Sequence, residues 1–129
     1  MPTLGDADAY AAIPAQDLER ARSFYAEKLD LKPTEQRSDG LLYRCGNGGF
    51  MLFPSSGKAS GDHTQLGWSV ENLEVVVKEL RDRGVQFEEY DQPGFKTVDG
   101  IAEIEGERGA WFKDSEGNLL AIGELNLTS

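Results

Sequence analysis

The sequence predicts an α+β fold built from two βαβββ modules, and three observations support this prediction. In the segment AAIPAQDLERARSFYAEKLDL an apolar strand leads directly into a helix. A looser copy of this segment, LGWSVENLEVVVKELRDRGVQF, follows 55 residues later. Each predicted helix is followed by three strand-like runs. An internal repeat of this kind is typical of similar modules that bury each other's open faces.

The first module occupies about residues 9–54. Residues 10–15 are short and apolar and predict a strand, and Pro14 places it at a sheet edge or at a strand end. Asp17 can cap a helix whose apolar residues recur at helical spacing, at Leu18, Ala21, Tyr25 and Leu29. Runs at 32–37, 41–46 and 49–54 predict three strands, and the turn sequences SDG and GNG between them favour hairpins.

A Gly/Ser-rich linker at about 55–64 leads into the second module, at about 65–124. A strand is expected at 65–70, followed by a helix that Asn72 caps and Gly84 ends. Further strands are expected at 85–90, 109–114 and 118–125. The intervening residues 91–108 predict a long connection of the kind that is usually functional or mobile, and whether it acts as a lid stays open. We expect the chain, 1–129, to form a single domain.

The composition limits the classes of partner. Acidic residues outnumber basic residues 23 to 13, which gives a net charge of −10. Such a surface repels nucleic acids and anionic membranes and attracts cationic small molecules. The alternative is that the charge only keeps the protein soluble.

The sequence also predicts a cytoplasmic protein. Cys45 is the only cysteine, so no internal disulfide can form, which agrees with a reducing compartment. The first residues lack a basic segment followed by an apolar run, so no signal peptide is expected. No run of 18 apolar residues predicts a membrane span.

Two motifs carry a resemblance to a known family. They are FYAEKL at the end of the first predicted helix and F-x-D-x-x-G-N at residues 112–118. Together with the repeat, they make residues 9–124 resemble the vicinal oxygen chelate superfamily, which includes glyoxalase I, extradiol dioxygenases, fosfomycin-resistance enzymes and bleomycin-resistance proteins. The resemblance implies that each module curls a mixed sheet into half of a cup, with the helices on the outer face and a cavity between the modules.

The same resemblance locates the metal ligands of the metal-dependent members, which place His, Glu or Gln on the first and last strand of each module. Distances from the shared motifs map these places onto Tyr10, Leu52, Gln65 and Ala121, with an uncertainty of one residue at Leu52. Leucine and alanine cannot coordinate a metal, and a tyrosine phenol must first lose a proton whose pKa is about 10. We therefore expect a metal-free member with no metal ligands and no cofactor.

Strand alternation predicts the cavity wall. If Tyr10 and Gln65 point into the cup, then Ala12, Gly67 and Ser69 do so as well, and Ile13, Trp68 and Val70 face the helices. The predicted ligand-binding residues are Tyr10, Phe50, Leu52, Gln65, Ser69, Leu119 and Ala121. The alternative is that these side chains fill the cup as core. Trp111 and Phe112 must occupy opposite faces of one strand, and the sequence does not decide which of them faces inward.

Other candidate residues have simpler interpretations. His63, the sole histidine, lies beside the linker and is expected in an exposed loop. Cys45 is expected to be a buried thiol. The alternating Glu103, Glu105 and Glu107 predict a solvated edge, although three carboxylates near a cup mouth could also attract a cation.

Three functions are compatible with these features. The first is a metal-independent binding protein of the bleomycin-resistance type, which sequesters an antibiotic or a hydrophobic or cationic metabolite; the resemblance implies that it is a homodimer. The second is a lyase, dioxygenase or other glyoxalase-like enzyme with a non-standard site. In such an enzyme Tyr10 is the candidate general acid, although no catalytic residue is identified. The third is a protein–protein module whose cup is closed.

Overall fold

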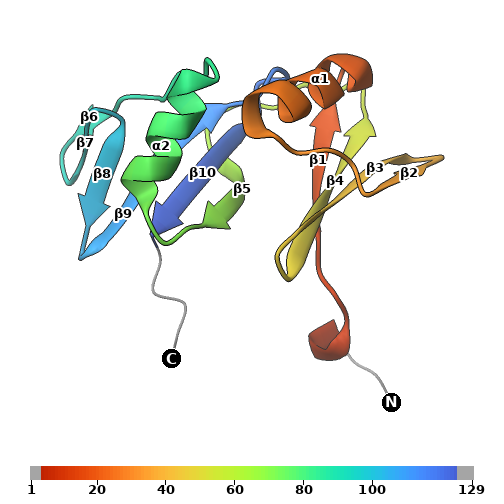
Figure 1. The fold of residues 1–129 in the computed structure, drawn as a ribbon, viewed down its shortest axis with the longest axis horizontal. Helices are drawn as coiled ribbons and strands as arrows, with labels where there is room; N and C mark the ends of the chain where they lie inside the picture. Colours follow the sequence, from red (N-terminus) through yellow and green to blue (C-terminus); the bar gives the residue numbers. More distant parts are fainter. Residues whose placement is uncertain (1–3, 125–129) are drawn as a thin grey trace.

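The computed structural model describes residues 4–124 and contains two modules that lie side by side (Figure 1). A short 3-10 helix, Leu4–Asp6, precedes the first module. That module forms a four-stranded sheet in the order β1-β4-β3-β2, with one helix. Its elements are β1 (Ala11–Ala15), α1 (Leu18–Leu29), β2 (Glu35–Arg37), β3 (Gly40–Cys45) and β4 (Gly48–Pro54).

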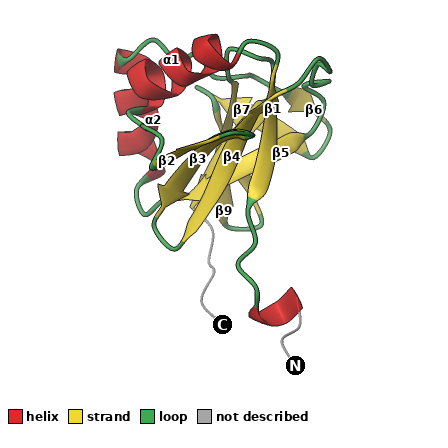
Figure 2. Ribbon diagram, turned by 90° about the vertical axis from the view of Figure 1, so that its right-hand side faces the viewer, coloured by secondary structure: helices red, strands yellow, loops and turns green. Residues whose placement is uncertain are grey.

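The second module forms a six-stranded sheet in the order β5-β10-β9-β8-β7-β6. Its elements are β5 (Thr64–Ser69), α2 (Leu73–Asp82), β6 (Asp91–Gln92), β7 (Phe95–Val98), β8 (Ile101–Ile104), β9 (Glu107–Lys113) and β10 (Leu119–Glu124). The first strand of each module pairs in parallel with the last, β1 with β4 and β5 with β10. Both helices lie on the same side of the sheets (Figure 2). The predicted α+β class and the repeated module are confirmed.

The strand prediction for residues 85–90 is wrong. This segment makes only one isolated bridge, between Phe87 and Phe112. Instead, β6, β7 and β8 form within residues 91–108, which were expected to be a connection. The reason is turn chemistry: Asp99–Gly100 and Glu105–Gly106 have positive φ at both positions, as type I′ hairpin turns require. The segment therefore extends the sheet and does not form an irregular lid.

The helix boundaries agree with the sequence. Asp17 accepts a hydrogen bond from the Arg20 amide at 3.0 Å, and Asn72 accepts one from the Val75 amide at 3.3 Å. These side chains satisfy amide groups that the first turn of a helix leaves without partners. Gly84, with φ of +95°, follows the last turn of α2, as predicted. Within the described residues, neither helix is both long and apolar enough to span a membrane.

Aromatic rings form the centre of the core in module one. Tyr25 of α1 contacts Tyr43 and Phe50, which stack on each other with centroids 4.7 Å apart. Burial raises the pKa of Tyr43 to about 12, because the phenolate would lose its hydration. The Tyr43 hydroxyl is buried and has no hydrogen-bond partner among the described residues. Phe50 also meets Trp68 of module two edge to face at 6.0 Å, so the cores of the two modules are in contact.

The turn between β9 and β10 fastens module two to module one. The Tyr25 hydroxyl donates to the Asp114 carboxylate at 2.8 Å, and the Asn118 side-chain amide donates to the Pro14 carbonyl at 3.0 Å. Arg20 donates twice to Glu116, whose carboxylate also accepts the Asp17 amide. The hydrogen bonds from Arg20 hold the pKa of Glu116 at about 2. We call Asp114, Glu116 and Asn118, with their partners Arg20 and Tyr25, the module latch.

Candidate functional site

A cleft of about 1110 Å³ lies between the two modules. Module one contributes the beginning of β1 and the hairpin between β3 and β4, at residues 45–50. Module two contributes strands β5, β8, β9 and β10. The cleft opens beside the start of β1, whereas the module latch holds the end of the same strand. Its volume is sufficient for a drug-sized organic molecule.

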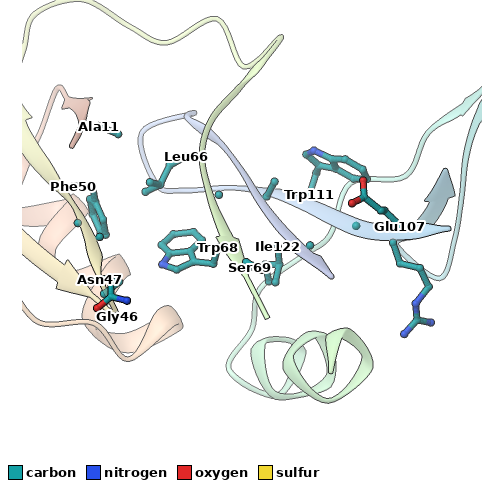
Figure 3. A pocket seen from close by; sticks show the side chains of 18 of the residues that line it. Ala11, Gly46, Asn47, Phe50, Leu66, Trp68, Ser69, Glu107, Trp111 and Ile122 are labelled. Atoms are coloured by element: carbon teal, nitrogen blue, oxygen red, sulfur yellow. The ribbon is translucent and has the colours of Figure 1, made fainter. Parts of the chain in front are cut away.

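Aromatic side chains stand on both sides of the cleft. Phe50 of module one and Trp68 of module two approach each other, and Trp111 stands apart from them on β9 (Figure 3). Trp68 and Trp111 are partly exposed, whereas Phe50 is buried and only borders the space. Phe112, the neighbour of Trp111, is fully buried beneath the helices. The question that the sequence left open is therefore answered: Trp111 faces the cleft.

Four of the seven predicted ligand-binding residues line the cleft: Tyr10, Phe50, Ser69 and Ala121. The Tyr10 side chain is largely in solvent, at 60% exposure for the residue. The other three, Leu52, Gln65 and Leu119, do not border it. Whether the four lining residues contact a ligand stays a prediction.

The expected placement of Leu52 on the cavity wall is corrected by the strand register. Leu52 lies opposite Ile13 in the parallel pair of β1 and β4, so both side chains point to the helix side. Both are almost completely buried there. The neighbours Met51 and Phe53 take the opposite face, since a shift of one residue reverses every side chain of a strand.

Leu119 is expected on the cavity wall but does not border the cleft. Strand β10 pairs regularly with β9, so Leu119 shares a face with Ala121, and the register shift against β5 comes from the extra residue Gln65 on β5. Leu119 is 5% exposed and joins the buried residues. Alternation therefore assigns the face of Leu119 correctly, but its burial keeps it from bordering the cleft.

Several lining residues were not predicted from the sequence. Trp68 faces the helices as expected, but its ring also reaches the cleft. Gly109, Gly123 and Ala102 line it through strand positions that carry little or no side chain. Such positions give no chemical signal in a sequence, because small residues are equally common where strands merely pack closely.

Charged side chains stand at the rim of the cleft. Arg108 donates to Glu124 from its Nε at 2.9 Å and to Glu74 from its Nη2 at 3.0 Å. These hydrogen bonds raise the pKa of Arg108 and lower that of Glu124, so both groups keep their charge. Glu105 and Glu107 also line the cleft. Among the charged residues that line the cleft, the carboxylates of Glu105 and Glu107 outnumber the single guanidinium of Arg108, which gives the rim a negative character.

The reactive side chains of the cleft do not form a nucleophile–base pair. Tyr10, Cys45 and Ser69 line it, and among residues 4–124 none of their side chains is hydrogen-bonded to a base. A base of this kind is one of the means by which proteins activate a nucleophile. Cys45 is partly exposed at the cleft, so the expectation of a buried thiol is wrong. His63 is exposed in a loop, as expected, and does not line the cleft.

The residues at the four metal-ligand places do not fit a metal ion. Tyr10 and Gln65 offer one phenol and one amide oxygen, and Ala121 offers no donor. On β4, Leu52 is buried in the core, and its neighbours Met51 and Phe53 carry no nitrogen or oxygen donor. One phenol and one amide oxygen are too few, because a divalent ion is usually held by three or four protein ligands, most of them imidazole, carboxylate or thiolate groups. The described residues contain no group of three His, Cys, Asp or Glu side chains able to hold a metal ion.

Comparisons with known proteins agree with this architecture. Residues 9–122 match the family model of the Glyoxalase/Bleomycin resistance protein/Dioxygenase superfamily. Among curated proteins, none matches the sequence significantly. Many solved structures share the fold, and three illustrate the range.

The first is UcmS2, which is 18% identical over 92% of this chain and 98% of its own, with a TM-score of 0.71. The second is a glyoxalase/bleomycin resistance protein/dioxygenase from Alicyclobacillus acidocaldarius, 20% identical over 92% of this chain and 90% of its own, with a TM-score of 0.69. The third is the oxidase ChaP-H1, 19% identical over 95% of this chain and 98% of its own, with a TM-score of 0.68. At these identities the likeness concerns the fold alone.

Proposed function

The chain belongs to the Glyoxalase/Bleomycin resistance protein/Dioxygenase superfamily, and on that premise we propose that it is a metal-independent small-molecule-binding protein. Its ligand is an organic compound, hydrophobic or cationic, held in the cleft between the modules. Sequestration of an antibiotic or a metabolite in the cytoplasm is the role that such binding serves.

One observation carries this proposal. The cleft has the volume of a ligand-binding site and is lined by both modules. The strand positions that hold the metal in metal-dependent members carry Tyr10, Gln65 and Ala121 here. A wall of aromatic and small apolar residues with few polar groups is typical of sites that capture organic molecules. The acids Glu105 and Glu107 at the rim favour a cation over an anion.

Dialysis of the protein against a metabolite extract, followed by mass spectrometry of the retained compounds, tests the proposal. We expect one or a few compounds to be enriched with unchanged mass. Ala121→Trp, which places an indole inside the cleft, is the matched variant and should retain none of them. A compound released with altered mass would indicate catalysis instead, and no enrichment would indicate a protein–protein module.

We extend the proposal to a homodimer. Leu42, Met51 and Phe53 share the face of the four-stranded sheet that points away from α1, and all three are only partly buried. Apolar side chains that a single chain leaves partly in water favour coverage by another protein surface. A second copy of this chain supplies that surface without requiring another partner.

A further inference from the structure

Trp111 is a partly exposed side chain that packs against two aromatic neighbours. Its ring meets Phe95 of β7 at 5.2 Å and Tyr90 at 6.0 Å, edge to face in both cases. Phe95 and Tyr90 stack on each other at 5.0 Å. Trp111 lines the cleft, whereas its two aromatic neighbours do not. The indole is therefore supported from behind and presented to the cleft.

Gly109 leaves room for the indole to lie against the sheet. It precedes Trp111 by two residues on β9, so both positions belong to the same face of the sheet. A Cβ at Gly109 would lie 3.1 Å from Cη2 of Trp111, which is tighter than nine in ten real Cβ contacts. The absence of a side chain at this position allows the indole to lie along the strand.

The sheet positions beside Trp111 on the side of β10 and β5 carry only small residues. In the row that contains Gly109, the partners across three strands are Ala102, Gly123 and Ser69. Beside Trp111 itself, the partner on β10 is Ala121. All of these residues line the cleft. The surface next to the indole is thus low and even, so that a flat group can approach it closely.

We propose that Trp111 is the specificity-determining residue of the cleft and selects flat aromatic ring systems as ligands. A planar ring lies on the low surface beside Trp111 and makes contact with the indole, whereas a rounded aliphatic group of similar volume cannot contact both. Because Phe95 and Tyr90 already order the indole, little side-chain entropy is lost when a ring binds. This inference rests on the proposed function and names the ligand class of the same cleft.

Two probe cations of different shape test the inference. Proflavine is planar and aromatic, and 1-adamantylamine is compact and aliphatic, so the comparison varies shape at equal charge. Titration calorimetry on the intact chain should give proflavine the tighter dissociation constant. Trp111→Leu should weaken proflavine binding about tenfold and change adamantylamine binding less than about twofold. Trp111→Phe should restore most of the preference for proflavine.

A substitution of Phe95, which lies outside the cleft wall, tests whether the aromatic neighbours hold the indole in position. Phe95→Leu should reduce the preference for proflavine about threefold without altering a lining residue. A merely structural role of Phe95 would lower the melting temperature and leave the ratio of the two affinities unchanged. In a Trp68→Phe background, Trp111 is the only tryptophan, and its fluorescence should be quenched when proflavine binds.

The outcomes separate this inference from the proposed function. If both probes bind equally well and Ala121→Trp abolishes both, the cleft binds small molecules but Trp111 does not select them, and the inference is overturned alone. Equal weakening of both probes by Trp111→Leu would overturn it as well. If neither probe nor any extract compound binds, the proposed function fails and the inference fails with it.

Discussion

Tyr25 donates a hydrogen bond to Asp114 at 2.8 Å, and this contact joins two sequence motifs that lie 89 residues apart. Tyr25 belongs to FYAEKL and Asp114 to F-x-D-x-x-G-N, the two segments on which the family resemblance rests. Burial and the nearby Asp114 carboxylate raise the pKa of Tyr25 well above its ordinary value, so the hydroxyl remains a donor. The motifs therefore set the relative position of the modules, and with it the shape of the cleft.

We predict that Tyr25→Phe lowers the free energy of unfolding by about 1.5–3 kcal/mol, because a buried hydrogen bond to a carboxylate is lost. Tyr43→Phe is the matched control, since the Tyr43 hydroxyl is equally buried but has no partner among the described residues. It should be neutral or slightly stabilising. Urea unfolding measures both changes. Equal losses of unfolding free energy in the two variants would show that the hydrogen bond to Asp114 does not stabilise the fold.

The ion pair of Arg20 with Glu116 predicts a defined pH dependence. The pKa of Glu116 is about 2 in the folded protein and 4.5 ordinarily. The stabilisation is thus fully present above pH 4.5 and is lost as the pH falls toward 2. It amounts to about 3 kcal/mol. Glu116→Gln should remove this part of the acid dependence, as measured by unfolding between pH 2 and 6.

Asp82→Asn is the control for that experiment. Asp82 pairs with Lys78 at 3.1 Å on the exposed surface of α2, where ion pairs contribute little. Its pH profile should follow that of the unmodified protein. If Glu116→Gln also followed that profile, the latch would not depend on the charge of Glu116.

The local stability of β7, the strand that carries Phe95, depends on the buried Thr97. Thr97 donates to the Glu89 carboxylate at 2.6 Å and accepts the Tyr90 amide at 2.8 Å. Thr97→Val removes both bonds at nearly constant volume, so amide hydrogens in residues 90–104 should exchange about tenfold faster, whereas those of α1 should not change. Val98→Thr, at the exposed neighbouring position, should have no comparable effect. Uniform acceleration throughout the chain would contradict a local role.

The proposed homodimer makes a prediction about Phe53. Sedimentation velocity at tens of micromolar should show a dimer for the unmodified chain and a monomer for Phe53→Glu, since a carboxylate would be buried without a partner. Val75→Glu, the same kind of change at an exposed position of α2, should remain dimeric. A monomeric unmodified chain at these concentrations would contradict the proposal.

Local signals in the sequence were sufficient for much of the fold. The caps Asp17 and Asn72 act within one helical turn, so each could be identified from its own neighbourhood. The type I′ turn at Asp99–Gly100 is equally local, since the dipeptide DG is itself a hairpin signal. The repeat also predicted the order of elements in module one, but not the strands β6, β7 and β8 of module two.

The site was less predictable because it depends on pairing between distant strands. Leu52 faces the core since β4 pairs with β1 in one particular register, and no nearby residue specifies that register. Trp111 likewise could not be assigned to a face until its pairing with Ala121 was known. The contact of Tyr25 with Asp114 connects both modules and leaves no pattern within either motif.

The most direct test of metal-independent binding is the affinity of the chain for its retained ligand with and without a chelator. The protein is purified without added ions, its metal content is measured, and binding is titrated with and without EDTA. We predict one bound molecule per cleft, the same dissociation constant in both conditions, and no stoichiometric nickel, zinc, manganese or iron. Loss of binding in EDTA, restored by one of these ions, would contradict the account.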